Sequence, residues 1–137
     1  MTAKDYLSQV RRATVLIRLK QREIDKLQQG LEYKAVNYEV ERVQSSANDR
    51  TDLICKLLDF EHELKEQIKE LVNLKGEIIK TIDTIKDTDL IEVLYLRYLE
   101  CMQWEEIALK MNYSYRWILK LHGQALLKIE KILNRTY

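Results

Sequence analysis

The chain has 137 residues, the size of one or two small domains, and its formal net charge of +1 gives no overall sign of nucleic-acid binding. It contains no proline and three glycines, whereas average usage of about 5% would supply roughly seven prolines. Because so few residues can interrupt a helix, the composition predicts an all-α fold. No apolar run reaches the ~18 residues of a membrane-spanning helix, and the N-terminus lacks a signal-peptide core, so we expect a cytoplasmic protein with no membrane partner.

The first long helix is predicted over residues 3–30. Thr2 can cap it, with Asp5 three residues later as a weak capping box. Residues 1–30 carry seven basic and three acidic side chains, and the arginines gather on the face opposite the apolar stripe. This face is either the solvated side of a coiled coil or a surface for nucleic acid or an acidic partner. The stripe is Tyr6, Val10, Ala13, Ile17, Ile24, Leu27 and Leu31, and the arginines are Arg11, Arg12, Arg18 and Arg22.

Residues 31–49 give weaker signals. The first helix either ends at Gly30 or continues through it. Residues 31–44 alternate only partly between apolar and polar side chains and have no visible partner strand, so we favour weak helix or irregular chain over a strand. Residues 45–49, Ser-Ser-Ala-Asn-Asp, are small and polar, which predicts a loop.

A second long helix with a heptad pattern is predicted over residues 50–86. Further apolar side chains flank its a and d positions, so the stripe is wider than one partner helix would cover. The two helices would form a hairpin or coiled coil over residues 1–86. A second copy of the chain would cover the remaining flank and give a homo-oligomer; the alternative is that residues 31–49 fold back as a helix and cover the flank within one chain. Gly76 lies within this helix and is interpreted as the site of a close helix crossing. The d positions are Leu57, Leu64, Leu71, Ile78 and Ile85.

Residues 87–137 are predicted to form a separate helical domain. Asp87 or Thr88 can cap a first helix that is densely apolar from residue 90 to residue 99. A short helix opens at Trp104, whose bulk can pack in the core or whose indole N–H can reach a phosphate, and we favour packing. Asn112 tolerates the left-handed conformation that ends a helix, and Ser114 is a strong N-cap. A turn is therefore predicted at residues 112–113, with a new helix after Ser114.

This last helix has two distinct faces. Apolar side chains at helical spacing from Ile118 to Ile132 form a stripe that should face inward. Tyr115, Arg116, Leu119, Lys120 and Gln124 fall largely outside that stripe. An exposed first turn with tyrosine, arginine and lysine suits contact with base edges and phosphates.

The sequence lacks the patterns that catalysis or metal binding would need. It contains no Gly-rich phosphate loop, no G-x-S-x-G and no H-E-x-x-H motif. Cys55 and Cys101 are isolated and are interpreted as reduced, semi-buried core cysteines. Glu105 and Glu106 are adjacent, and neighbouring helical residues point about 100° apart, so they form no acid–base pair. We expect no enzyme activity, no catalytic residue, no cofactor and no metal.

The stretch from Trp104 to Leu126 is similar to region four of bacterial sigma factors, a helix-turn-helix module that binds the upstream promoter element. The resemblance extends over about residues 87–133 and is strongest to small sigma-like proteins of phages and prophages from Gram-positive bacteria. The family pattern combines an L-R-Y/F segment, E-E-I/V-A/G, S/T-x-x-x-I/V and A-L before a helical tail. The matching residues are Leu96-Arg97-Tyr98, Glu105-Glu106-Ile107-Ala108, Ser114, Ile118 and Ala125-Leu126.

The resemblance implies a set of DNA-binding residues. Tyr115 and Arg116 match the first positions of the recognition helix, and Lys120 matches the next turn. Arg97 matches an arginine that contacts the DNA backbone, and Gln124 completes the predicted set. Because the usual Arg-Glu pair is replaced here by Tyr115-Arg116, the family's base preference does not carry over.

These observations predict a sequence-specific DNA-binding transcription regulator, encoded by a phage or prophage and acting near RNA polymerase. Residues 115–137 carry five basic side chains and one acidic, whereas residues 50–86 are slightly acidic. The alternative is a helical protein–protein interaction module, such as a polymerase-binding or assembly factor, without specific DNA binding. We expect no autonomous sigma activity, because the chain is too short for elements that melt DNA and grip the polymerase core.

Overall fold

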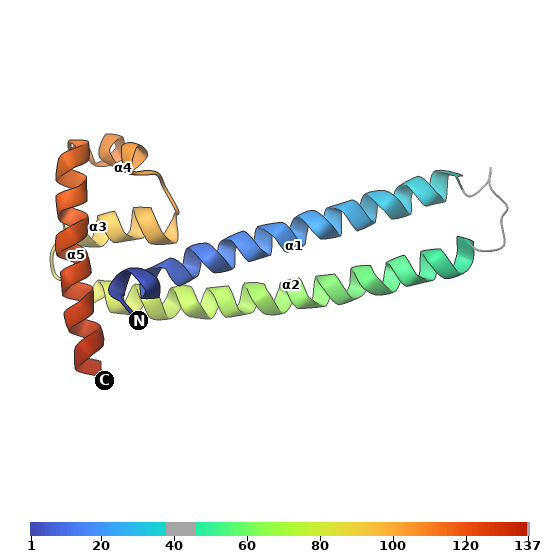
Figure 1. The fold of residues 1–137 in the computed structure, drawn as a ribbon, viewed down its shortest axis with the longest axis horizontal. Helices are drawn as coiled ribbons and strands as arrows, with labels where there is room; N and C mark the ends of the chain where they lie inside the picture. Colours follow the sequence, from blue (N-terminus) through green and yellow to red (C-terminus); the bar gives the residue numbers. More distant parts are fainter. Residues whose placement is uncertain (38–45, 137) are drawn as a thin grey trace. The chain divides into compact units, whose positions relative to one another are not determined.

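The computed structural model describes the backbone of residues 1–37 and 46–136, and the side chains of residues 1–32 and 49–135. These residues are helical apart from short connections and contain no strand, which confirms the all-α prediction (Figure 1). The elements are α1 (Ala3–Asn37), α2 (Ser46–Asp83), α3 (Thr88–Leu94), the π-helix η1 (Tyr95–Leu99), α4 (Trp104–Met111) and α5 (Tyr115–Thr136).

The ends of the two long helices differ from the predicted ends. α1 does not stop at Gly30 but continues to Asn37. Gly30 does not adopt a positive φ, so it lowers helix stability there without ending the helix. α2 begins at Ser46, so the loop predicted at residues 45–49 is wrong from residue 46 onward, and Asp49 suits the positive end of this helix. Residues 38–45 of the predicted irregular stretch lie outside the described part.

The start of α1 has the predicted capping box. The Asp5 N–H donates to Thr2 Oγ1 at 3.2 Å, and the Thr2 N–H donates to Asp5 Oδ2 at 3.3 Å. The two hydrogen bonds satisfy two of the backbone N–H groups that a helix N-terminus leaves without an intrahelical partner. Hydrogen bonding of the Asp5 carboxylate by the Thr2 side chain, and then by the Thr2 backbone, holds the pKa of Asp5 below its usual value.

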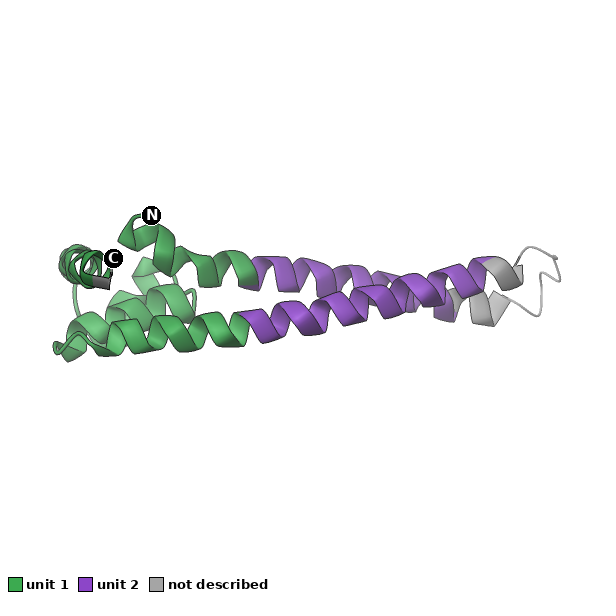
Figure 2. Cartoon of the chain, turned by 90° about the horizontal axis from the view of Figure 1, so that it is seen from below, with its two compact units in different colours: residues 1–13, 71–137 green, residues 14–70 purple. Residues whose placement is uncertain are grey.

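The chain divides into two compact units (Figure 2). The first contains residues 1–13 and 71–137, and the second contains residues 14–70. The boundary that we expected between residues 86 and 87 therefore falls inside the first unit, because the start of α1 and the end of α2 share a core with the C-terminal helices. Whether residues 87–137 also fold alone stays a prediction.

One hydrophobic core fills the first unit. Burying one large aliphatic side chain contributes about 1.5–3 kcal/mol, so a core of this size fixes the orientation of the short helices. Tyr6 and Thr81 add a hydroxyl–hydroxyl hydrogen bond of 3.0 Å between α1 and α2. The buried residues are Ala3, Leu7, Val10, Ile78, Ile82, Ile85, Leu90, Val93, Leu94, Leu96, Tyr98, Ile107, Ala108, Ile118, Leu121, Ala125 and Ile129.

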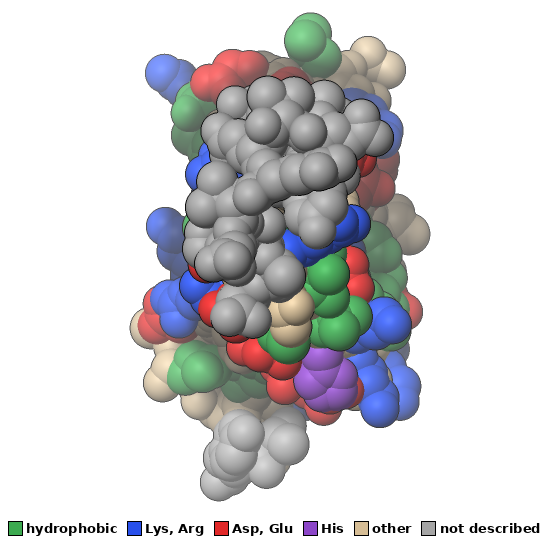
Figure 3. Space-filling view, turned by 90° about the vertical axis from the view of Figure 1, so that its right-hand side faces the viewer, with side chains coloured by type: hydrophobic (Ala, Val, Ile, Leu, Met, Phe, Trp, Pro, Cys, Tyr) green, Lys and Arg blue, Asp and Glu red, His purple; other side chains and the backbone are tan. Residues whose placement is uncertain are grey.

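The second unit has a much smaller buried core. Its parts of α1 and α2 lie side by side (Figures 1 and 2), and Lys20 Nζ forms an ion pair with Glu63 Oε2 at 2.8 Å. Among its described side chains only Ile24 and Leu64 are buried. Figure 3 shows apolar side chains at the surface among charged ones at this end of α1 and α2. The exposed apolar residues of the unit include Leu16, Leu19, Ile54, Leu58 and Ile68.

Two predictions for single residues of α2 are wrong. Gly76 does not mark a close helix crossing, because a Cβ atom built there would meet nothing within 4 Å. Cys55 is not semi-buried but exposed. Cys101 does have the predicted intermediate exposure. We find no helix among the described residues that is long and apolar enough to cross a membrane.

Candidate functional site

The helix that supports the candidate site changes its winding partway along. Asp87 caps α3, because its Oδ1 accepts a hydrogen bond from the Asp89 N–H at 3.0 Å, as predicted for Asp87 or Thr88. After Leu94 the chain forms π-helix η1, in which the Glu100 N–H donates to the Tyr95 carbonyl at 3.0 Å. Cys101 then has a left-handed backbone with φ of 57°. This π-helix was not predicted; such segments are rare and often occur at functional sites.

The turn between α4 and α5 lies at residues 112–114, in agreement with its predicted position. Asn112 is left-handed with φ of 57°, and the Tyr113 N–H donates to the Ala108 carbonyl at 3.1 Å. Ser114 caps α5, because its Oγ accepts a hydrogen bond from the Trp117 N–H at 3.1 Å. The Tyr113 hydroxyl donates to Asp89 Oδ2 at 2.8 Å, which ties the turn to α3.

One face of α5 packs against α3 and α4. Ile118, Ala125 and Ile129 have no exposed surface, and Leu121 is 5% exposed. On α4, Ile107 is fully buried and the small Ala108 is 8% exposed, which permits the helices to approach closely. Since the inward face is fixed by this packing, the opposite face of α5 is held toward solvent.

The four predicted site residues of α5 lie on its exposed side. Tyr115, Arg116, Lys120 and Gln124 are all exposed. Arg116, Lys120 and Gln124 are spaced four residues apart, so they follow one another along the same side of the helix. Their arrangement presents two cations and an amide over about two turns.

Sequence reasoning missed Trp117, which belongs to the same exposed surface. This side chain is 41% exposed, and Lys120 Nζ lies 5.2 Å from the centre of its ring. The Tyr113 ring meets it edge-on at 6.4 Å between ring centres. The signal that could have identified this group is helical spacing: Tyr113, Trp117 and Lys120 are four and then three residues apart.

Arg97, the fifth predicted site residue, makes its contacts within the protein. It lies on η1 and is half-buried. Its Nη1 donates to the Met102 carbonyl at 3.0 Å, and its guanidinium lies over the Trp104 ring at 4.4 Å. These contacts give Arg97 a structural role, and its contact with a DNA phosphate stays a prediction.

An aromatic cluster joins η1, α4 and α5. The Tyr98 hydroxyl and His122 Nε2 are 2.6 Å apart, and the two rings are stacked. Trp104 meets the His122 ring at 4.5 Å between centres, so Trp104 packs inside the protein as predicted. Burial is the main cause that lowers the pKa of His122 to about 4, and Lys4 and Arg97 lower it further.

The same cluster settles the protonation of both hydrogen-bonding partners. Burial raises the pKa of the Tyr98 hydroxyl to about 12, so this group stays protonated at neutral pH. His122 is then neutral as well, and the direction of its hydrogen bond with Tyr98 follows from the imidazole tautomer: Nε2 accepts when the ring proton lies on Nδ1. His122 therefore contributes to packing and hydrogen bonding within the protein.

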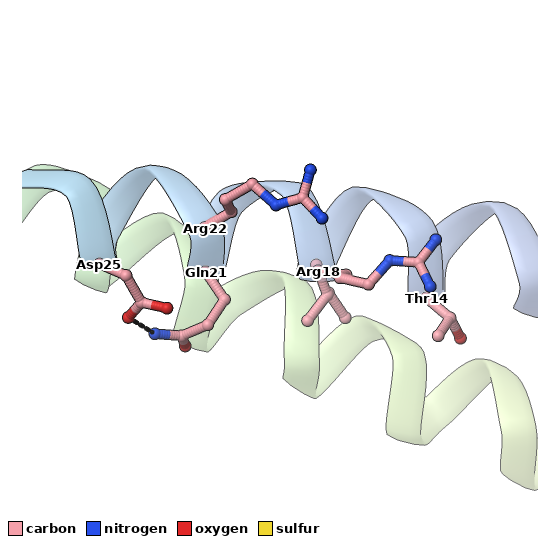
Figure 4. A pocket seen from close by; sticks show the side chains of 6 residues that line it. Thr14, Arg18, Gln21, Arg22 and Asp25 are labelled. Atoms are coloured by element: carbon pink, nitrogen blue, oxygen red, sulfur yellow. Dashed lines mark hydrogen bonds between the residues drawn. The ribbon is translucent and has the colours of Figure 1, made fainter.

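A shallow hollow lies on α1 in the second unit (Figure 4). Its volume is about 440 Å³, and all its lining residues come from α1 itself: Thr14, Ile17, Arg18, Gln21, Arg22 and Asp25. Gln21 Nε2 donates to Asp25 Oδ1 at 3.0 Å. Figure 4 shows the guanidinium groups of Arg18 and Arg22 extending from the helix. Because one helix supplies every wall, the hollow is an open basic face rather than an enclosed site.

The described residues contain no group of three or more histidine, cysteine, aspartate or glutamate side chains that could hold a metal ion.

The described residues define an all-helical protein in which a three-residue turn joins α4 to α5 and one side of α5 is exposed. The chain belongs to the family described as "Protein of unknown function (DUF1492)", which matches residues 35–130. No curated protein and no solved structure matches the chain.

Proposed function

We propose that the protein is a DNA-binding transcription regulator that reads duplex DNA with the exposed side of α5. The observation that carries the proposal is the position of Arg116, Lys120 and Gln124 on the solvent side of a helix whose other side is buried. α4, the turn and α5 would act as a helix-turn-helix, in which the second helix enters the major groove.

The chemistry of this surface suits both backbone and base contacts. An arginine can donate two hydrogen bonds to guanine O6 and N7, and a glutamine can pair with adenine. Lys120 supplies a point charge for a phosphate. Residues 115–137 have a net charge of +4, from five basic side chains and one acidic, which concentrates positive charge on this helix.

The resemblance to sigma region four extends the proposal to the partner and the setting. We propose that the protein acts on a promoter in a bacterial cytoplasm, beside RNA polymerase, and that it comes from a phage or prophage. Tyr113, Tyr115 and Leu119 are exposed around the first turns of α5 and would lie near any second protein on the same DNA. We expect no catalytic activity.

The test is a selection of bound sequences from a random duplex library, followed by fluorescence anisotropy with the selected DNA. The double variant Arg116→Ala, Lys120→Ala should lose specific binding, with about 1–3 kcal/mol from the arginine alone if it contacts guanine. The matched control is Lys131→Ala, Arg135→Ala, which removes the same two charges from exposed positions further along α5. Full specific affinity in the first variant would contradict the proposal.

A second candidate is a helical interaction module without specific DNA binding. The exposed apolar side chains of the second unit favour it, because contact with another protein would remove them from water. We propose that they pair with a second copy of the chain, so that a DNA-binding protein would also be a homo-oligomer. If the selection returns no enriched sequence, this candidate replaces the first.

A further inference from the structure

The first unit contains a small pocket between the start of α1 and the junction of η1 with α4. Its volume is about 100 Å³, and its lining residues are Lys4, Ser8, Arg11, Arg97, Tyr98 and Trp104. At about 30 Å³ for each water molecule, it holds some three waters or one small ion. The pocket lies apart from the four predicted site residues of α5, none of which lines it.

The α1 side of this pocket follows directly from the helical repeat. Lys4, Ser8 and Arg11 are four and three residues apart, so they line up along one face of the helix. Ala3, Leu7 and Val10 form the neighbouring stripe, and all three are buried in the core of the unit. Burial of that stripe fixes the rotation of α1 and holds Lys4 and Arg11 toward the pocket.

The three cations have no counter-charge among the described residues. No carboxylate of the described part forms an ion pair with Lys4, Arg11 or Arg97. Lys4 and Arg97 also lower the pKa of the nearby His122, which is what an unneutralised positive field does to an imidazole. Like charges held together without a partner repel one another, so the pocket favours an anion.

The opposite wall supplies a rigid donor. Arg97 is held over the Trp104 ring and donates from Nη1 to the Met102 carbonyl. A guanidinium has five N–H groups in a fixed plane, so others remain for an oxyanion. Planar arginine donors with a second cation are a recurring arrangement for phosphate oxygens.

We propose that this pocket binds one phosphate group, held by Lys4 and Arg11 from α1 and by Arg97 from η1. The phosphate comes either from a small phosphorylated solute or from the backbone of bound DNA, and only the second source rests on the proposed function. Loss of DNA binding by α5 variants would leave the first source untouched.

The test titrates the full chain with inorganic phosphate and follows the indole N–H resonance of Trp104 by NMR. The chain has two tryptophans, and Trp117→Phe assigns the signal. Sodium chloride at matched ionic strength serves as the reference for screening. We expect a saturable shift that Arg11→Gln weakens at least about fivefold, the equivalent of about 1 kcal/mol for a charged hydrogen bond.

The control is Arg12→Gln, the adjacent exposed arginine, which does not line the pocket. It removes the same charge and should change phosphate affinity by less than about twofold, as expected for a distant, screened surface charge. Arg11 is exposed, so its replacement leaves the core intact.

A second arm measures DNA binding against salt for the same two variants. If free phosphate gives no shift but Arg11→Gln makes the salt slope shallower by about one unit relative to Arg12→Gln, the phosphate is that of the DNA backbone. If neither arm separates the two variants, the proposal is wrong. If the protein binds no DNA, the phosphate titration alone decides.

Discussion

Neutral His122 should make the first unit sensitive to acid. In the unfolded chain a histidine titrates near pH 6.5, whereas burial holds the pKa of His122 at about 4 in the folded protein. Between these values the unfolded state binds more protons than the folded state. The stabilising contribution is therefore complete above about pH 6.5 and is lost as the pH falls toward 4.

The size of this effect follows from the two pKa values. Their difference, at about 1.4 kcal/mol per pKa unit, sets an upper bound of about 3.5 kcal/mol on the stability lost in acid. His122 is only half-buried, and solvent screening reduces that figure to about 1–2 kcal/mol. About 1 kcal/mol of it should be lost between about pH 7 and pH 5, before the folded-state group begins to titrate.

The assay is urea unfolding followed by far-UV circular dichroism at about pH 7 and pH 5. His122→Gln keeps a side chain that can hydrogen-bond to Tyr98 but cannot titrate, so its stability should depend less on pH than that of the wild type. Asp5, whose pKa is lowered below its usual value, stays ionised in both the folded and the unfolded chain at these two pH values, so it adds no pH dependence in this window. His62→Gln, at the exposed histidine of α2, should behave as the wild type. The same pH dependence in His122→Gln and wild type would refute the reasoning.

Three further substitutions give measurable results. Ile118→Ala removes a fully buried side chain of α5 from the core of the first unit and should lower the free energy of unfolding by about 2–5 kcal/mol. Gly76→Ala should raise it by about 0.5–1 kcal/mol in the same urea titration, because a Cβ meets nothing there and alanine favours the helix. Arg97→Ala should weaken binding to all DNA sequences alike and make the salt slope shallower by about one unit; a changed base preference with an unchanged slope would contradict this.

The turn between α4 and α5 could be predicted because its signals are local. Asn112 and Ser114 act through their own backbone, and one sequence suffices to recognise a left-handed residue followed by an N-cap. The loop prediction at residues 45–49 failed for the opposite reason. Small polar residues are weak signals, and the first turn of a helix accepts them when an acidic residue such as Asp49 lies there.

The aromatic cluster and the cationic pocket could not be predicted from the sequence. Tyr98 and His122 are 24 residues apart, and Lys4 precedes Trp104 by 100 residues. Their contacts depend on how helices pack, and helical periodicity states only which side of each helix is apolar. The π-helix adds a further obstacle, because it shifts the direction of the side chains after Leu94 away from the regular helical repeat.

Oligomerisation remains the prediction with the widest consequence, and the second unit supplies its physical argument. Fixing the backbone of a residue costs about 1–2 kcal/mol, whereas a buried aliphatic side chain contributes about 1.5–3 kcal/mol. With only Ile24 and Leu64 buried among its described side chains, this unit gains little from its own core. Leu16, Leu19 and Leu58 are 52%, 46% and 58% exposed, a pattern that favours burial against another helical surface.

A second copy of the chain offers such a surface with the same heptad spacing, and the prediction is a dimer or higher oligomer formed through the long helices α1 and α2. Sedimentation equilibrium at micromolar concentration should give a mass above the 16.4 kDa of one chain. Leu58→Lys should shift the equilibrium toward the single chain, because burying an unpaired ammonium costs far more than leaving it in water. The control is Lys56→Glu, which changes the charge at an exposed, already charged position nearby on α2. Cys55→Lys tests whether the interface also includes the exposed position of Cys55. A wild-type protein that sediments as a 16.4 kDa species throughout would rule the oligomer out, and the exposed leucines would then need another partner.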